Sequence, residues 1–285
     1  MSELQLVRYQ QAETFLATAG DYLAAREAEH NVILGISARL CSTPQLYASC
    51  PYFAVVRGED VVGAAIRTPP HNLLLSELAD PRALDLLVTD VNELFPDLPG
   101  VLGPKEVSRR FAELWREATG IEGRQTTAQR AFRCTTVVPP APVEGALRRA
   151  TEPDRALLVE WTDAFQLEAL TGAPPRAADE AVDDMLSREG LHGAYVWETD
   201  APVSFAACGN PTPNGVRIGP VYTPPAQRGR GYASALTASL TQLLLDGGYR
   251  FCFLFTDLAN PTSNKIYRQI GYEAVTDVDE YRFDS

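Results

Sequence analysis

The sequence predicts an α/β fold built from two tandem domains. Its 285 residues exceed the usual size of one domain, and a prior of about 150 residues per domain suggests two. Strand patterns and helix patterns alternate along the chain, and the same order of elements occurs on both sides of the proline-rich segment 139–142. These observations predict one domain at 1–138 and a second at 143–285.

The first half opens with a short alternating strand, which two helical stretches follow. Its best supported helix covers 105–119, where Val107, Phe111, Leu114 and Trp115 share one face and Gly120 ends the pattern. The expected elements are a strand at 4–8, helices at 13–32 and up to 40, a hairpin at 52–57 and 61–66, an apolar run at 72–76, a helix from 80 to about 94, strand-like 100–103, the helix at 105–119 and a strand at 131–138.

The second half repeats this order. We expect a strand at 145–150, helices at 152–170 and 176–187, a hairpin at 194–198 and 203–208, a strand at 216–222, a helix from 233 to 245, a buried strand at 249–255, a helix at 262–270, and closing strands at 272–275 and 280–283. The hairpins at 52–66 and 195–208 have similar turns, which indicates a diverged internal duplication. Chance recurrence of such orders in α/β chains is the alternative.

Composition and charge exclude several classes of protein. The net charge of −12 argues against general nucleic-acid binding, which needs a basic surface, and favours a cationic acceptor, although solubility alone also explains such a charge. The five cysteines are scattered without metal-ligand spacing, so we expect neither disulfides nor a metal site. The apolar runs are too short to span a bilayer and the first residues do not resemble a secretory signal. We therefore expect a cytoplasmic protein without membrane contact.

The stretch 221–245 reads as a strand end, a glycine-bearing loop and a long helix. Gly229 and Gly231 let the backbone approach an anion closely, and the free N–H groups at the start of the helix favour negative charge. The loop lacks the lysine and spacing of a nucleotide-triphosphate loop, and it matches the dinucleotide fingerprint only in part. It predicts an anion cradle, with a plain surface turn as the alternative.

Two motifs in this half resemble those of the GNAT superfamily of acetyl-CoA-dependent N-acetyltransferases. Arg228, Gly231 and Ala233 fit its Arg/Gln-x-x-Gly-x-Gly/Ala signature, and the pattern from Asn260 to Tyr272 fits its Asn, helix Tyr and Gly-Tyr order. The resemblance covers about 143–285. It implies two tandem GNAT-like domains, each with a mixed, mostly antiparallel central sheet flanked by helices, and acetyl-CoA as co-substrate.

The resemblance also implies roles for individual residues. Tyr267 is the expected catalytic acid that protonates the departing thiolate, with a half-buried core tyrosine as the alternative, and backbone N–H groups of Val221 and Thr223 are expected to polarise the carbonyl, since Pro220 has none. The expected cofactor-binding residues are Val221, Tyr222, Thr223, Arg228, Gly229, Arg230, Gly231, Tyr232, Ala233, Ser234, Asn260, Asn264 and Tyr267.

The general base stays unassigned, because the strand at 216–222 contains no carboxylate. Glu168, Glu198 and Asp257 are available, but each also fits a solvated surface group, and water suffices for an amine of modest pKa. In the first half, the corresponding helix starts with Asp80 and Pro81, which do not favour a phosphate. We therefore expect a single cofactor site, in the second half.

These features favour an acetyl-CoA-dependent N-acetyltransferase that acts on a primary amine of a small molecule or peptide by direct attack in a ternary complex. A covalent route needs an activated cysteine, and Cys208 and Cys252 lie inside apolar strands. The alternatives are a non-catalytic acyl-CoA-binding or regulatory module, kept open by the missing strand carboxylate, and a purely structural protein. The sequence leaves the acceptor and the oligomeric state open.

Overall fold

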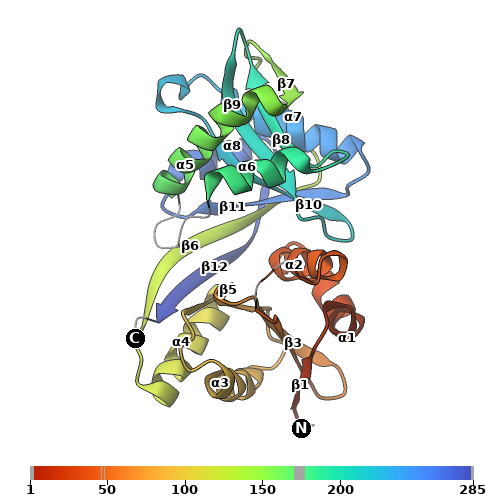
Figure 1. Ribbon diagram of the computed structural model, residues 1–285, viewed down its shortest axis with the longest axis vertical. Helices are drawn as coiled ribbons and strands as arrows, with labels where there is room; N and C mark the ends of the chain where they lie inside the picture. The colour runs from red at the N-terminus through yellow and green to blue at the C-terminus, as the bar shows by residue number, and fades with distance from the viewer. Residues whose placement is uncertain (1–2, 46, 48, 170–176, 284–285) are drawn as a thin grey trace. The chain divides into compact units, whose positions relative to one another are not determined.

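The computed structural model describes residues 3–45, 47, 49–169 and 177–283. The expected helix ends at Leu170 and Arg176 lie outside these residues. The chain divides into two compact units, the first formed by Met1–Arg130 with Thr276–Ser285 and the second by Ala131–Val275. Both are α/β, as expected, and each is described separately below (Figure 1).

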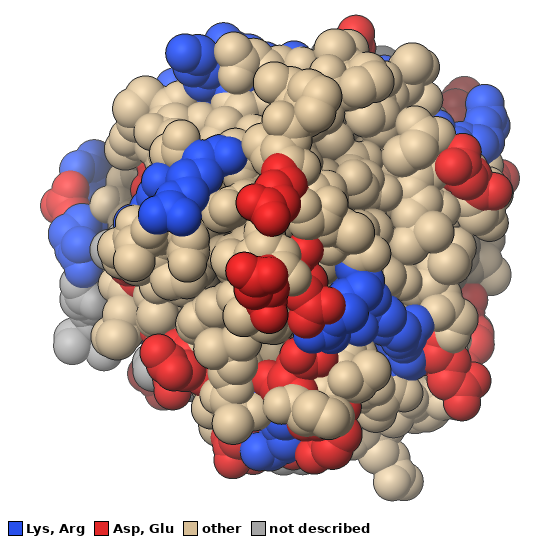
Figure 2. Space-filling model, turned by 90° about the horizontal axis from the view of Figure 1, so that it is seen from above, with Lys and Arg blue, Asp and Glu red and all other residues tan. Residues whose placement is uncertain are grey.

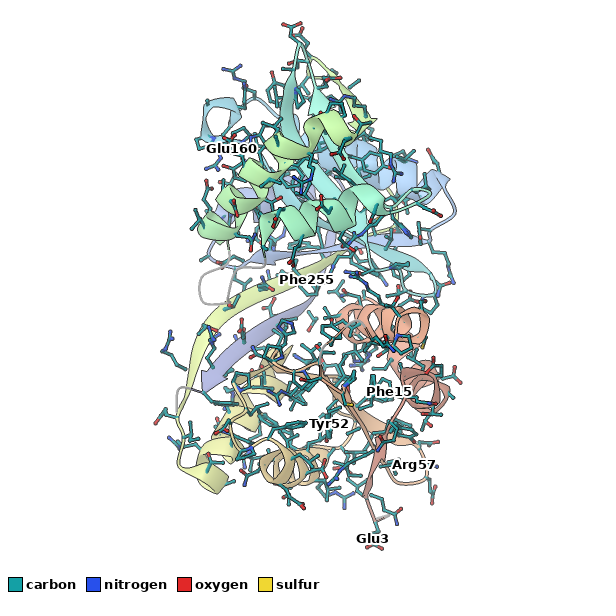
Figure 3. The ribbon with its side chains drawn as sticks, in the orientation of Figure 1. Glu3, Phe15, Tyr52, Arg57, Glu160 and Phe255 are labelled. Carbon is teal, nitrogen blue, oxygen red and sulfur yellow. The ribbon has the colours of Figure 1, made fainter. Side chains whose placement is uncertain are left out.

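The first unit is a sheet with helices on both faces. Its elements are β1 (Gln5–Tyr9), α1 (Ala12–Ala24), α2 (Asn31–Ser42), β2 (Tyr52–Arg57), β3 (Val61–Arg67), β4 (Leu73–Leu75), α3 (Ala83–Leu94), β5 (Gly100–Pro104) and α4 (Lys105–Thr119). Successive strands from β1 to β4 pair antiparallel, and β4 and β5 pair parallel. Strand β2 alternates between the two faces, so that Phe53 packs with α1 and α2 while Tyr52 packs with α3 and α4. Figure 3 labels Tyr52 on β2 and Phe15 on α1.

The second unit repeats this arrangement. Its elements are β7 (Ala146–Arg149), a 3-10 turn (Glu152–Asp154), α5 (Arg155–Ala169), α6 (Ala178–Ser187), β8 (Gly193–Glu198), β9 (Pro202–Gly209), β10 (Gly215–Tyr222), a second 3-10 turn (Pro225–Gln227), α7 (Tyr232–Asp246), β11 (Phe251–Asp257) and α8 (Pro261–Gln269). Strands β7 to β10 pair antiparallel and β10 pairs parallel with β11. Helices α5 and α6 pack on one face of this sheet, and α7 and α8 pack on the other. The shared order of strand directions supports the expected duplication.

Two strands run through both units, and they move the unit boundaries away from the expected 1–138 and 143–285. Strand β6 (Gly123–Cys134) follows α4 but ends in the second unit, where it neighbours β11. Strand β12 (Glu273–Phe283) follows α8 but pairs antiparallel with β5 of the first unit. Phe283 at its end stacks on Trp115 of α4, with ring centroids 5.4 Å apart. Each half of the chain therefore supplies a strand to the sheet of the other unit.

Polar side chains explain why β6 and β12 are longer than expected. The sequence predicted a strand at 131–138 and two short strands at 272–275 and 280–283. In the structure, Arg130 of β6 forms a bidentate ion pair with Asp277 of β12, with N–O distances of 2.7 and 2.9 Å. Thr127 donates to the Glu280 carboxylate at 3.0 Å. These cross-strand pairs stabilise segments that are too polar to read as strands from periodicity alone.

The helix expected at 13–32 is two helices with a break at 25–30. His30 lies in this break and is buried, with Nδ1 3.0 Å from the carbonyl oxygen of Leu23, while its Nε2 accepts the backbone N–H of Glu77 at 3.1 Å. The residues between α1 and α2 are held by contacts with a distant segment, which no helical periodicity reveals.

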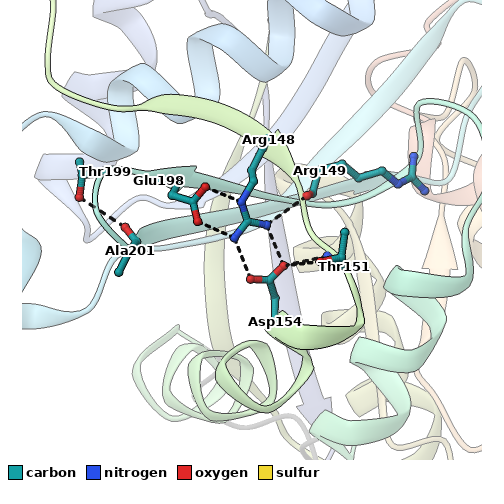
Figure 4. Close-up of polar contacts among 7 residues, drawn as sticks. All are labelled: Arg148, Arg149, Thr151, Asp154, Glu198, Thr199 and Ala201. Atoms are coloured by element: carbon teal, nitrogen blue, oxygen red, sulfur yellow. Dashed lines mark hydrogen bonds and ion pairs between the residues drawn. The ribbon is translucent and has the colours of Figure 1, made fainter.

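An arginine on β7 ties the start of α5 to the sheet of the second unit (Figure 4). The Arg148 guanidinium donates to both oxygens of Asp154, at 2.8 and 2.9 Å, and to both oxygens of Glu198, at 2.7 and 2.8 Å. Asp154 also accepts the backbone N–H of Thr151 at 2.8 Å. The Arg148 hydrogen bonds, more than any other influence, lower the pKa of Asp154 from 3.8 to about 2. This network fixes where α5 begins.

We expect Asp154→Asn to lower the free energy of unfolding at pH 7 by about 2 kcal/mol, because the pKa of Asp154 is lowered and its side chain is only 8% exposed. A lowered folded-state pKa stabilises the fold above the ordinary value of 3.8, and the contribution disappears as the pH falls through about 2. Urea unfolding of both proteins between pH 7 and 3 measures the difference, which should shrink below pH 4.

Asp183→Asn is the matched control, since Asp183 also pairs with an arginine, Arg155, but its side chain is 56% exposed. It should change stability much less than Asp154→Asn. Equal effects of the two substitutions, or a difference that does not depend on pH, would contradict the role given to Asp154.

Candidate active site

Strands β10 and β11 part halfway along their length. Their parallel pairing covers three residue pairs and ends at Arg217 and Phe253, although β10 continues to Tyr222 and β11 to Asp257. Figure 3 labels Phe255, which lies on the part of β11 beyond this pairing. Beyond that point the two strands leave polar backbone groups that no longer pair with one another. This opening lies at the carboxyl ends of both strands.

A bulge in β10 accompanies the opening. The antiparallel register with β9 shifts between Ile218 and Val221, across Gly219 and Pro220. Gly219 has φ of +150°, and Pro220 carries no N–H group. Val221 and Thr223, which the sequence indicated as carbonyl-polarising donors, follow the bulge and are half-buried. The bulge therefore redirects the backbone where the donors were expected.

The glycine loop has the backbone geometry that an anion cradle needs. Gly229 and Gly231 have φ of +76° and +85°, and Gly231 is the N-cap residue of α7. No side chain caps this helix, and the first N–H groups of a helix have no partner within it, here those of Tyr232, Ala233 and Ser234. Residues 228–231 are exposed. A Cβ at Gly231 would lie 3.0 Å from Cγ1 of Val143, so the loop also packs closely there.

The two arginines of the loop differ in their contacts. The Arg228 guanidinium donates to the Glu168 carboxylate of α5 at 2.6 Å and to the carbonyl oxygen of Thr223 at 2.8 Å, and it lies 5.7 Å from the centre of the Tyr222 ring. Arg230 is exposed and forms no hydrogen bond or ion pair with the residues that the structure describes. Arg230 is thus the loop guanidinium left available for an anion.

Helix α8 holds the remaining three residues that the sequence indicated. Asn260 caps the helix by accepting the backbone N–H of Ser263 at 3.0 Å. The Asn264 amide donates to the carbonyl oxygens of Asp257 and Asn260 at 2.8 and 2.7 Å, while its buried Oδ1 has no partner among the described residues. A buried amide oxygen without a partner is costly, which is consistent with a ligand donor at this position.

Tyr267 lies in the core between α8 and the sheet. Its side chain is 8% exposed and belongs to the cluster that contains Ile218 of β10 and Leu254 of β11, the first residues past the end of their pairing. Burial raises the pKa of Tyr267 to about 12, so the phenol stays protonated at physiological pH. Its hydroxyl has no hydrogen-bond partner among the described residues. A phenol in this state can donate a proton.

Sequence reasoning missed an aromatic cluster on the face of the sheet under α5 and a buried serine of β9, whose side chain is on the other face. Trp161 lies 6.2 Å from Phe205 and 6.4 Å from Tyr222, measured between ring centres. Ser204 is fully buried, donates to the carbonyl oxygen of Tyr222 at 2.9 Å and lies 2.7 Å from the Thr223 hydroxyl. A lone serine inside the apolar stretch 203–208 was the available signal, because a buried hydroxyl needs a partner.

The other indicated carboxylates and cysteines lie away from this loop or are unreactive. Of the three carboxylates, Glu168 contacts the loop, whereas Glu198 pairs with Arg148 and Asp257 accepts the N–H of Ala259 at 2.7 Å. Burial raises the pKa of the Cys208 thiol to about 11 and raises that of Cys252 as well. Neither thiol is therefore available as a thiolate nucleophile.

Other features of the described residues lie away from the loop. A cavity of about 410 Å³, which His192 and Tyr249 line, lies at the opposite ends of β10 and β11 from the loop. The described residues contain no cluster of three or more potential metal ligands, and no described helix is long and apolar enough to cross a membrane. On the face shown in Figure 2, acidic and basic side chains of the described residues are interspersed without a continuous basic area.

The corresponding helix of the first unit starts differently. Asp80 Oδ1 accepts the backbone N–H of Arg82 at 3.0 Å just before α3, and its carboxylate also pairs with the Arg82 guanidinium at 2.6 Å. A carboxylate already occupies the position that an anion would take at this N-terminus.

Comparisons with known proteins agree with this geometry. The sequence model of the Acetyltransferase (GNAT) family matches residues 156–272. No curated protein matches the sequence significantly. A GCN5-related N-acetyltransferase from Sphaerobacter thermophilus has a TM-score of 0.66 at 19% identity, over 97% of this chain and 95% of that chain. A Drosophila protein from a structural genomics programme has a TM-score of 0.67 at 13% identity, over 100% and 99% of the two chains.

A tandem GNAT protein from the clavulanic acid biosynthesis pathway has a TM-score of 0.57 at 14% identity and covers 98% of both chains. At such identities these structures establish the fold, and they confirm the tandem arrangement expected from the sequence. The chain therefore has the fold of tandem GNAT proteins, and most of its second unit matches the GNAT acetyltransferase family, whose members use acetyl-CoA as co-substrate.

Proposed function

We propose that the second unit transfers the acetyl group of acetyl-CoA to a primary amine of a small molecule or peptide, by direct attack in a ternary complex. The observation that carries the proposal is the opening between β10 and β11, at the ends of the two strands from which the loops to α7 and α8 begin. The uncapped start of α7 and the protonated phenol of Tyr267 on α8 support it. Acetyl-CoA supplies an activated thioester. The residues of this chain bind and orient the two substrates and exchange protons with them.

The glycine loop is proposed to hold the diphosphate. The backbone N–H groups of residues 229–234 face no competing side-chain cap, and Gly229 and Gly231 have no Cβ in the way. Arg230 adds a free positive charge, whereas Arg228 is already neutralised by Glu168 and positions the loop instead. Asn264 and Asn260 at the start of α8 are proposed to bind the pantetheine arm, where the unpaired Oδ1 of Asn264 can accept an amide N–H.

The chemical step needs a polarised carbonyl, a neutral amine and a proton for the leaving sulfur. We assign the first task to the backbone N–H groups of Val221 and Thr223. The amine nitrogen forms a bond to the carbonyl carbon as the carbon–sulfur bond breaks, Tyr267 gives its proton to the thiolate, and the proton of the amine leaves to water or a carboxylate. The raised pKa values of Cys208 and Cys252 favour this direct route over a covalent intermediate.

A non-catalytic acyl-CoA-binding module is the second candidate. It is favoured by one observation, that β10 carries no carboxylate to deprotonate an amine. In that case acetyl-CoA binds and no amine is acetylated.

We expect Gly231→Glu to weaken acetyl-CoA binding at least 100-fold, since it puts a carboxylate and a Cβ into the proposed phosphate cradle. Calorimetry gives the dissociation constant. Gly248→Glu is the matched control, because Gly248 also has positive φ, +105°, but lies beyond the other end of α7. Similar losses in both variants, or none in either, would show that the loop does not bind acetyl-CoA.

Tyr267→Phe should lower kcat about 100-fold while the dissociation constant of acetyl-CoA changes less than about threefold, since only a proton donor is removed. Thiol release and calorimetry measure the two quantities. Tyr272→Phe removes a neighbouring buried hydroxyl, which lies 2.7 Å from that of Thr241, and should affect stability without lowering kcat comparably. If acetyl-CoA binds but neither the wild type nor the variant releases thiol with any amine, the binding-module alternative holds.

One acetyl-CoA should bind per chain, because a carboxylate occupies the start of α3 in the first unit whereas that of α7 in the second unit is open. Titration calorimetry of the full chain gives the stoichiometry. Binding of two acetyl-CoA molecules per chain, one of which still binds after Gly231→Glu, would place a further site in the first unit and contradict this assignment.

A further inference from the structure

Arg217 occupies the last paired position before the opening between β10 and β11. It lies opposite Phe253 in the parallel register with β11 and opposite Gly209 in the antiparallel register with β9. The next residues of β10 and β11, Ile218 and Leu254, belong to the core that contains Tyr267. Arg217 therefore stands at the base of the opening in which the reacting groups are proposed to meet.

Its side chain is on the face opposite to Tyr267. Val216 and Ile218 on either side of it pack with α7 and α8, and side chains of a strand alternate between faces. The face of Arg217 is the one on which Phe205 and Ala207 pack with α5 and α6. Arg217 is therefore on the face of the sheet that does not carry α7 and its proposed cofactor cradle, and we expect the acceptor amine on that face.

The Arg217 guanidinium has no counter-ion among the residues that the structure describes. It forms no hydrogen bond or ion pair with the described residues, although it is half-buried. A second cation, Arg188, acts on its charge. The Arg188 guanidinium lies over Gly209 and binds Asp184 at 2.7 Å and the carbonyl oxygen of Cys208 at 2.9 Å. Burial, and then the charge of Arg188, lower the pKa of Arg217.

An unpaired, partly buried charge beside a like charge destabilises a fold, because the lost hydration is not compensated. Four other arginines of this unit, Arg148, Arg155, Arg188 and Arg228, each pair with a carboxylate. Arg217 differs from these arginines because it pairs with no carboxylate of the described residues. It lies at the edge of the proposed active site, where a locally unfavourable residue is expected to serve function.

We propose that Arg217 binds an anionic group of the acceptor, so that the amine acetylated by this protein carries a carboxylate or phosphate close to its amino group. This inference rests on the proposed acetyl transfer and names its substrate class. A guanidinium presents two parallel N–H donors to such an anion, which fixes the orientation of the attached amine. The acidic net charge favours a cationic acceptor such as an amine, and Arg217 adds a positive charge at the base of the opening that an anionic group of the same acceptor would complement.

The test compares matched acceptors at saturating acetyl-CoA by thiol release. Leucine, phenylalanine and lysine are paired with their carboxamides, β-alanine with propylamine, and phosphoethanolamine with ethanolamine. We expect at least one anionic acceptor to have a kcat/KM at least tenfold above that of its neutral partner. Comparison of the carboxylate pairs with the phosphate pair shows which anion the protein prefers. Arg217→Gln should remove this preference with less than a threefold change for the neutral partner, and Arg217→Lys should retain part of it.

Arg57→Gln is the control for loss of one positive charge, since Arg57 is exposed at the end of β2 in the first unit (Figure 3). It should leave the preference intact. Binding of acetyl-CoA is measured by calorimetry before the acceptors are compared. If acetyl-CoA does not bind, the proposed function itself is refuted. Binding and turnover without a preference for the anionic members refute only the role of Arg217. If no acceptor reacts, calorimetry with the protein–CoA complex replaces turnover, and equal affinity for both members of every pair overturns the inference.

Discussion

The separation of β10 from β11 is the constraint on which the rest of the second unit depends. Two parallel strands that stay paired would satisfy their backbone groups and leave no room for a ligand. Here the register with β11 ends at Arg217, and the bulge across Gly219 and Pro220 turns the remainder of β10 away. Because the strands are parallel, their carboxyl ends open on one edge, where the loops to α7 and α8 also begin.

Fixed polar contacts hold this open edge in place. Ser204 of β9 binds Tyr222 and Thr223 at the end of β10, and Arg228 joins the same segment to Glu168 of α5. The Arg148 network sets where α5 begins. Since the strands beyond Arg217 lack each other's hydrogen bonds, these side-chain contacts replace part of the support that a continuous sheet would give. The loop is thereby presented on a rigid frame, which suits a site that must orient two substrates.

Burial divides the reactive groups of this unit by the chemistry left to them. A phenol with a pKa of about 12 keeps its proton, as the donor role proposed for Tyr267 requires, whereas a thiol with a pKa raised to about 11 is a poor nucleophile because little thiolate forms. On the other face of the sheet, burial also makes the charge of Arg217 unfavourable without an anion. Desolvation thus disfavours a covalent route through a cysteine thiolate and leaves direct attack by the amine as the favoured route.

The sequence located the glycine loop of the second unit and the helix at 105–119 of the first unit because their signals are local. Gly229 and Gly231 are required by positive φ, and the helix at 105–119 has its apolar stripe and terminal glycine within a few turns. Contacts between residues far apart in the sequence could not be predicted from local patterns. Arg228 with Glu168 and Arg130 with Asp277 are examples. The full lengths of β6 and β12 were not predicted for the same reason, because their polar residues are stabilised by contacts with a partner strand that is distant in the sequence.

The interchange of β6 and β12 has a consequence for how the chain is made. Strand β5 receives its antiparallel neighbour β12 only after more than half of the sequence has followed it. Ribosomal synthesis proceeds at roughly 5–20 residues per second, so the backbone edge of β5 stays uncovered on the order of ten seconds or longer. An uncovered edge invites pairing with a neighbouring nascent chain. Polysomes, where such neighbours are close, are therefore where this architecture is most exposed to misassembly.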